Sequence, residues 1–322
     1  MPRAAAGISV TATLEAELGL ALGRPVSDLE RLSGGTSRET WRFVCGDRRL
    51  ILRRDPETAD VPDLFQSQAI DRDTERLLIA LAGAVGVPVP RIEAVVPHGY
   101  VMECLAGETI PRRILRDPAL AEARTKLAGE CGRALAGLQT LAPDRLPPLP
   151  RLDVPSQIAA WRDLLDRLGE ARPVFELAMT WLEDHRPAPL PEVLVHGDFR
   201  LGNLMIGPFG LVGVLDWELA HLGDPAEDLG WLCVRSWRFG APEPVAGVGR
   251  RVDLLAAFGG GVDAARLAYF EVFGTLRWGM ICLIQVYTHL SSARRSLELA
   301  AIGRRVSETE YDLLNLIGSG AG

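Results

Sequence analysis

Two segments decide the fold of this chain: HGDFRLGN at residues 196–203 and LDWE at residues 215–218. An apolar run precedes the first segment and predicts a buried strand ending in a turn that carries Asp198. Asn203 follows five residues later, and Asp216 stands thirteen residues beyond Asn203, after a second apolar run. A hairpin of that length can bring Asn203 and Asp216 back beside Asp198.

These three side chains are two carboxylates and one carboxamide, and such oxygen donors are the ligands that Mg²⁺ accepts beside water and phosphate. If Asn203 and one acid hold a metal, the other acid can orient an attacking hydroxyl or accept its proton. Phosphoryl transfer needs little beyond in-line positioning and charge neutralisation. A single aspartate here would be an ordinary turn residue, but the three together at this spacing indicate a phosphotransfer site.

The region before this site predicts a small antiparallel lobe with one main helix, which we assign to residues 1–105. Apolar periodicity and turn residues define its elements. These are helices at 9–23 and 68–84 and strands at 29–33, 40–45, 50–53, 91–96 and 100–104.

Residues 106–322 are predicted to form a larger, mostly helical lobe, so the fold class is α+β with two lobes. Helices are expected at 119–142 and 156–186, two short strands flank the turn at 207–210, and most of 225–317 is helical in pattern. The most apolar stretch, 278–293, is shorter than the roughly 18 residues needed to span a membrane. It is predicted to be a buried helix.

Composition narrows the class of protein. The net charge of −7 argues against a nucleic-acid partner. The five cysteines are scattered and form no CxxC pair, which favours reduced structural thiols over a disulfide framework or a zinc cluster. No signal peptide is recognisable at the N-terminus. A cytoplasmic protein without a membrane partner is the expectation.

The pair HGDFRLGNLM and VLDWELAHLGDPAEDL, beginning at residues 196 and 214, resembles the signature HxDxxxxN followed by a metal-binding Asp. Aminoglycoside phosphotransferases, choline kinases and, more remotely, protein kinases share this signature. The resemblance covers roughly residues 28–317. It implies a protein-kinase-like fold, the use of ATP and Mg²⁺, and a small-molecule hydroxyl acceptor.

Within this family the chain looks similar to the branch that is also found joined to acyl-CoA dehydrogenases. That branch suggests a hydroxyacyl acceptor. An aminoglycoside is less expected, because the C-terminal helices carry no dense acidic cluster that would hold a polycation. A structural role is favoured over acceptor contact for each of the candidate residues in those helices, which are Arg235, Arg277, Trp278, His289 and Arg294.

The resemblance assigns roles in the catalytic segments by position. Asp198 would be the catalytic base, and Asn203 and Asp216 would be metal ligands. Arg200 stands two residues after the base, where protein kinases place a positive group near the transferred phosphate. A silent nucleotide-binding protein on the same fold is the alternative function.

Three further residues have supporting roles by the same resemblance. His196 would brace the catalytic loop through hydrogen bonds, and Asp228 would tie that loop to the following helix. Trp217 stands where protein kinases have Phe, so a kinase-like Phe switch is not expected. A hydrolase that uses His196, Asp198, His221 and Asp224 as metal ligands is a third reading of these residues.

The sequence evidence for nucleotide binding in the first lobe is weaker than that for the catalytic segments. The small residues Gly34, Gly35, Thr36 and Ser37 resemble the family's nucleotide loop, whose backbone N–H groups can approach phosphates. They match neither GxGxxG nor a Walker motif, and alone they would be a hairpin turn.

Arg53 occupies the strand position where the family has a Lys that pairs with the phosphates and with a helix Glu. Arginine presents a planar fork in place of a point charge. Glu75 is the expected helix acid, with Asp71 and Asp73 as competitors. The hinge between the lobes would be the last predicted strand of the first lobe, where the adenine would meet Met102, Glu103, Cys104 and Leu105.

Overall fold

The computed structural model describes residues 4–32, 38–56, 69–291 and 295–318 of the chain. Its first part is a five-stranded antiparallel sheet in the order β1-β2-β3-β5-β4. The strands are β1 (Val26–Arg31), β2 (Glu39–Cys45), β3 (Arg48–Arg54), β4 (Ile92–Val96) and β5 (Gly99–Glu103).

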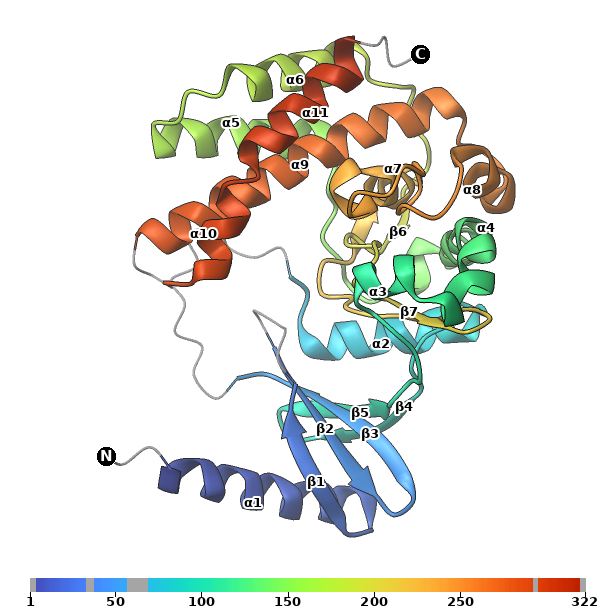
Figure 1. The fold of residues 1–322 in the computed structure, drawn as a ribbon, viewed down its shortest axis with the longest axis vertical. Helices are drawn as coiled ribbons and strands as arrows, with labels where there is room; N and C mark the ends of the chain where they lie inside the picture. The colour runs from blue at the N-terminus through green and yellow to red at the C-terminus, as the bar shows by residue number, and fades with distance from the viewer. Residues whose placement is uncertain (1–3, 33–37, 57–68, 292–294, 319–322) are drawn as a thin grey trace.

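Two helices flank this sheet, α1 (Ala4–Leu22) and α2 (Arg72–Ala84), as Figure 1 shows. The alternation in β2 explains the first contact, because Phe43 points to the face that packs on Leu14 and Leu18 of α1. Leu78 of α2 joins the core of the helical part instead. The helix α2 therefore lies between the sheet and the rest of the molecule.

The remainder of the described chain is mainly helical. Its helices are α3 (Pro111–Arg116), α4 (Ala121–Leu138), α5 (Val154–Leu168), α6 (Pro173–Asp184), α7 (Glu227–Cys233), α8 (Arg251–Phe258), α9 (Ala264–Leu290), α10 (Leu297–Gly303) and α11 (Val306–Gly318). Single 3-10 turns are η1 (Pro118–Leu120), η2 (Pro143–Arg145) and η3 (Arg235–Arg238). The predicted α+β, two-lobed class is confirmed (Figure 1).

One predicted helix is wrong in its extent. The span 156–186 forms two helices, because Gly169 ends α5 in the left-handed conformation at φ 65° and Pro173 begins α6. Both residues are visible in the sequence as a stop and a start signal. The short elements α3 and β9 (His221–Gly223) were not predicted at all.

The helix α9 runs through the centre of the helical lobe. It begins at Ala264, fourteen residues before the apolar stretch that was predicted as a buried helix. By length and composition α9 could cross a membrane, but 72% of its most apolar window is buried inside the fold. Figure 1 shows other helices on several sides of it. It is the core helix of this lobe.

Two small antiparallel strand pairs hold the predicted site. In one pair β6 (Val193–Val195) lies beside β9, and in the other β7 (Leu204–Gly207) lies beside β8 (Gly210–Val214). The backbone of Ile70, just before α2, donates to the carbonyl of Glu218 at 2.8 Å. The N-terminal part is thereby joined directly to the segment that carries Asp216.

Candidate active site

The turn after β6 is fixed by a buried carboxylate. Asp228, in α7, accepts hydrogen bonds from the backbone N–H groups of His196 (2.7 Å) and Gly197 (3.0 Å). Burial raises the pKa of Asp228, while His196 and these two backbone donors act in the opposite direction. The turn needs glycine, because Gly197 has φ +85° and a Cβ there would collide with the carbonyl of Leu219.

The fully buried imidazole of His196 links three parts of the site. Its Nδ1 accepts from the backbone N–H of Asp198 at 3.2 Å, so its Nε2 carries the hydrogen donated to the Leu215 carbonyl at 3.1 Å. The ring also packs on Trp217, which has no solvent-exposed surface. His196 thus joins the loop of Asp198 to the segment of Asp216.

Three donors surround the carboxylate of Asp198. Its Oδ1 accepts from Nε of Arg200 and from Nε1 of Trp231, both at 2.9 Å. Its Oδ2 accepts from Nδ2 of Asn203 at 2.6 Å. A carboxylate oxygen can accept about two hydrogen bonds, so Oδ2 has room for one more donor and Oδ1 does not.

Asn203 connects Asp198 to the neighbourhood of Asp216. The backbone carbonyl of Asn203 accepts from the backbone N–H of Leu215 at 2.8 Å. Asp216 itself has the left-handed backbone conformation, φ 66°, which Asp tolerates better than most residues. Since the Asn203 amide nitrogen faces Asp198, its amide oxygen is available, and with the Asp216 carboxylate it makes a donor set suited to Mg²⁺.

Arg53 reaches this group from β3. Its Nη2 lies 2.5 Å from Oδ1 of Asp216 and its Nε lies 3.2 Å from Glu75. Burial lowers the pKa of Arg53, but the carboxylates of Glu75 and Asp216 outweigh it and raise the pKa overall. Of the three candidate helix acids, Glu75 is in contact with Arg53.

The two competing acids have other partners. Asp71 caps the N-terminus of α2 by accepting from the Thr74 N–H at 2.9 Å. Asp73 is exposed and lies near Arg72 and Arg76.

Two contacts at the site were missed in the sequence. Arg38 donates to Glu75 at 2.6 Å and to the Ile70 carbonyl at 2.5 Å, so Glu75 is shared by two arginines. Trp231 donates to Asp198. The only signals were positional, since Arg38 follows the small-residue loop directly and Trp231 lies three residues after Asp228.

A cleft of about 410 Å³ is lined by most of the described residues that were predicted to contact the nucleotide. The predicted residues Gly34, Gly35, Thr36 and Ser37 lie outside the described part of the chain, as does Arg294. The other predicted residues that line the cleft are Arg53, Glu75, Met102, Glu103, Cys104, Leu105, Asn203 and Asp216.

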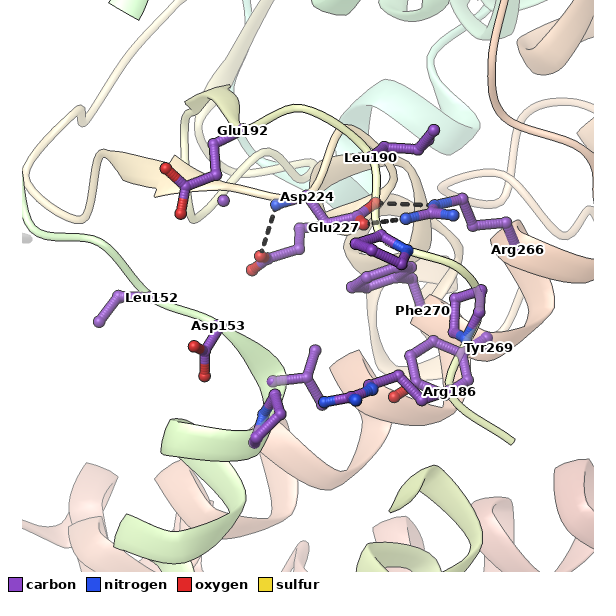
Figure 2. Close-up of a pocket in the computed structure, with 15 residues that line it drawn as sticks. Leu152, Asp153, Arg186, Leu190, Glu192, Asp224, Glu227, Arg266, Tyr269 and Phe270 are labelled. Carbon is purple, nitrogen blue, oxygen red and sulfur yellow. Dashed lines mark hydrogen bonds and ion pairs between the residues drawn. The ribbon is translucent and has the colours of Figure 1, made fainter. Parts of the chain in front are cut away.

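A separate pocket, shown in Figure 2, lies where α5 and α9 begin. It contains Asp224, whose carboxylate pairs with Arg266. His221 instead contacts Glu227 at 3.2 Å. Among the described residues no cluster of three His, Cys, Asp or Glu could hold a metal ion. Because Asp224 pairs with Arg266 and His221 contacts Glu227, neither residue joins His196 and Asp198 in a shared metal site. This arrangement argues against the hydrolase hypothesis.

A two-lobed fold of the protein-kinase type, with this set of acids between its lobes, is that of a phosphotransferase. The chain belongs to the phosphotransferase enzyme family, whose family model matches residues 28–268. The resemblance inferred from the two motifs is thus confirmed, including its link to the acyl-CoA dehydrogenase branch.

Among its relatives, acyl-CoA dehydrogenase family member 10 of Mus musculus is 31% identical over 221 residues, which cover 64% of this chain. They cover only 20% of that protein, so the chain spans about a fifth of its length. A solved structure from Ralstonia eutropha JMP134, classed with the aminoglycoside phosphotransferases, superposes with a TM-score of 0.70 at 23% identity and covers 96% of this chain and 98% of its own.

The structure of spectinomycin phosphotransferase in complex with ADP and spectinomycin superposes with a TM-score of 0.63 at 14% identity. The match covers 93% of this chain and 97% of that one. At this level of identity the two solved structures establish the fold.

Proposed function

We propose that this protein transfers the γ-phosphoryl group of ATP, in the presence of Mg²⁺, to a hydroxyl group of a small molecule. The observation that carries the proposal is that Asn203 is hydrogen-bonded both to Asp198 and to the residue before Asp216. Its side-chain amide donates to the Asp198 carboxylate at 2.6 Å, and its backbone carbonyl accepts from the Leu215 N–H at 2.8 Å. One base and one metal-ligand pair are thereby held within a single hydrogen-bonded unit.

In this proposal the acceptor hydroxyl donates to Oδ2 of Asp198, the oxygen with an unused lone pair. The hydroxyl oxygen forms a bond to the γ-phosphorus as the bond to the bridging oxygen breaks, ADP leaves, and the proton passes to Asp198. Arg200, held against Asp198 at 2.9 Å, would turn toward the transferred phosphate. A bound Mg²⁺ would neutralise phosphate charge, and Asn203 and Asp216 would hold it.

On the nucleotide side, Arg53 would exchange Asp216 for phosphate oxygens while Glu75 holds it in place. The adenine would lie against Met102 in the cleft. Because the Glu103 N–H already donates to the Arg91 carbonyl at 2.9 Å, adenine recognition would fall to the backbone of Cys104 and Leu105. The small-residue loop 34–37 would cover the phosphates. The ADP bound to spectinomycin phosphotransferase supports adenine nucleotide use on this fold.

We further propose that the lobes divide at residues 105 and 106, that the protein acts in the cytoplasm, and that its acceptor is a hydroxyacyl compound. The relationship to acyl-CoA dehydrogenase family member 10 supports such an acceptor. An aminoglycoside remains the less favoured choice.

An ADP-release assay over a panel of hydroxyl compounds, hydroxyacyl-CoA esters and aminoglycosides tests the function. With the best acceptor, Asp198→Ala should lower turnover by about 10²–10⁴-fold, as loss of a general base does, while MgATP still binds. Asp216→Ala should weaken MgATP binding as well. Asp47→Ala, in the exposed turn between β2 and β3, is the matched control and should behave as wild type.

The silent nucleotide-binding alternative rests on the 2.5 Å contact between Arg53 and Asp216, which occupies a proposed metal ligand. It predicts thermal stabilisation by ATP with no ADP release on any acceptor. Near-wild-type turnover by Asp198→Ala would contradict the proposed mechanism itself.

A further inference from the structure

The helical lobe has a second large cavity, of about 1250 Å³, which shares no lining residue with the interlobe cleft. Its walls come from the start of α3, from η3 with the loop after it, and from the start of α11. The two cavities are neighbours, because Thr109 lines the interlobe cleft and the next residue, Ile110, lines this one.

A short chain of aromatic contacts joins this cavity to Asp198. Trp237 lies between two lining residues, Ser236 and Arg238. Its ring is 5.1 Å from that of Trp231, whose indole donates to Asp198. The guanidinium of Arg200 lies 4.6 Å from the centre of the Trp237 ring. Trp237 and Trp231 therefore connect the wall of the cavity to the carboxylate of the proposed base.

The cavity is rich in arginine although the whole chain carries a net charge of −7. Four arginines line it against two acids, Glu308 and Asp312. Both acids are already neutralised, since Arg305 lies 3.0 Å from Glu308 and Arg235 lies 3.3 Å from Asp312. A cationic acceptor would find no unpaired carboxylate among these lining residues.

The two remaining arginines differ in their partners. Arg238 donates to Glu271 at 2.7 Å and to the Cys233 carbonyl, which anchors it in the wall. Arg112 is exposed and, within the described part of the chain, has no acidic partner. Arg235 contacts Asp312 through Nη1, yet 61% of its side chain is exposed. Arg112 and Arg235 thus present guanidinium groups to the cavity, and such planar groups bind carboxylates and phosphates through paired hydrogen bonds.

We propose that this cavity binds an oxyanionic group of the acceptor, so that the substrate is an alcohol carrying a carboxylate or phosphate. This proposal rests on the phosphotransferase function proposed above, because that function is what makes the bound molecule an acceptor. The volume of the cavity exceeds the roughly 300–1,000 Å³ of ordinary small-molecule pockets, so an acceptor would fill only part of it. Phe239 and Tyr311 add aromatic surface beside the arginines. An acceptor with a charged end and an apolar part fits this lining.

Binding of inorganic phosphate at constant ionic strength tests the proposal without turnover. The protein is first saturated with MgADP, so that the nucleotide site is filled, and tryptophan fluorescence is then followed because Trp237 is adjacent to the arginines. We expect a saturable response. The dissociation constant should rise about tenfold in Arg112→Gln and further in Arg112→Gln/Arg235→Gln, the loss expected when hydrogen bonds to a charged group are removed.

Arg250→Gln is the matched control, because Arg250 is exposed and pairs only with Asp253 among the described residues. It should bind phosphate as wild type does. The Arg112→Gln variant should fold normally, since Arg112 is exposed and pairs with no described acid. The thermal shift produced by MgADP should be unchanged in each variant, which verifies that the variant is folded.

No saturable response in the wild type, or a response unchanged in the double variant, would overturn the proposal. The second result would place phosphate beside MgADP instead. A saturable response to choline that the double variant weakens would also overturn it, in favour of a cation. A protein that binds phosphate as expected but releases no ADP would refute the kinase function alone, and an active kinase without this phosphate response would refute the oxyanion site alone.

Discussion

The indole of Trp231 reaches the carboxylate on which the proposed chemistry depends. Trp231→Phe keeps an aromatic ring beside Trp237 but removes the 2.9 Å hydrogen bond to Asp198. A hydrogen bond to a charged group contributes about 1.5–3 kcal/mol, and 1.4 kcal/mol corresponds to about a tenfold change in rate. We expect kcat to fall about tenfold or more with the KM for ATP unchanged, measured by ADP release.

Trp181→Phe provides the comparison for this change. Trp181 is partly buried in α6, where its ring packs on His185. The Trp181→Phe substitution should leave both kcat and the KM for ATP unchanged. If Trp231→Phe raised the KM for ATP as much as it lowered kcat, its indole would be acting on the fold of the cleft and not on the position of Asp198.

Arg53 is the residue that we propose to bind the phosphates of the nucleotide. It bridges Asp216 at 2.5 Å and Glu75 at 3.2 Å. Arg53→Gln should weaken MgATP binding about tenfold or more, because charge-assisted contacts to phosphate are lost. Calorimetric titration with MgATP measures this. Arg49→Gln, an exposed position on the same strand, should leave binding unchanged, and equal affinities for all three proteins would place the phosphates elsewhere.

At the scale of elements, the turn after β6 depends on one glycine. Gly197→Ala adds both the cost of a left-handed conformation, about 1 kcal/mol or more, and a collision with the Leu219 carbonyl. Gly169→Ala adds only the first cost, because nothing lies within 4 Å of a Cβ there. Thermal melts should show a clearly larger loss for Gly197→Ala. Equal losses would mean that the turn can relax without harm to β6.

Strong periodicity made most elements predictable. The β2 and β3 strands and the helix α2 lie within a few residues of their predicted spans, because alternation and the 3.6-residue repeat both report burial. The α5–α6 break was missed although Gly169 and Pro173 marked it. The strand β9 was missed for a different reason, since its three residues, His221–Gly223, are too few to show any period.

The site was predictable to the extent that its members adjoin in sequence. Asp198, Asn203 and His196 lie in one short segment, and their spacing indicated a shared loop. Arg38, the partner of Glu75, directly precedes β2, and Trp231, the partner of Asp198, lies in α7. No local sequence pattern indicates such contacts. They depend on how the lobes and helices pack, which only the assembled fold provides.

At the scale of the whole molecule, the two lobes meet around a cleft that combines β3 and β5 with the β7–β8 pair. Arg53 on β3 contacts Asp216 after β8, and the Ile70 backbone contacts Glu218. These contacts cross between distant parts of the sequence. A ligand that occupies the cleft should therefore shield residues of both lobes together.

Cysteine accessibility gives a direct test of that cleft. Burial raises the pKa of Cys131, Cys233 and Cys282 to about 12, so at about pH 8 only about one in 10,000 of each thiol is the reactive thiolate. Cys45 is buried, while Cys104 is partly exposed and lines the cleft. We expect iodoacetamide to modify Cys104 first, as measured by peptide mass spectrometry.

MgATP at tenfold its dissociation constant should slow this modification about tenfold, because only the unoccupied fraction of the protein reacts. The Asp216→Ala variant should need more MgATP for the same protection, since the proposed metal ligand is lost while the hinge is unchanged. Modification of Cys104 at the same rate with and without MgATP would show that the nucleotide does not lie against the 102–105 segment. Protection that persisted unchanged in Asp216→Ala would keep the nucleotide in the cleft but remove Asp216 from its binding.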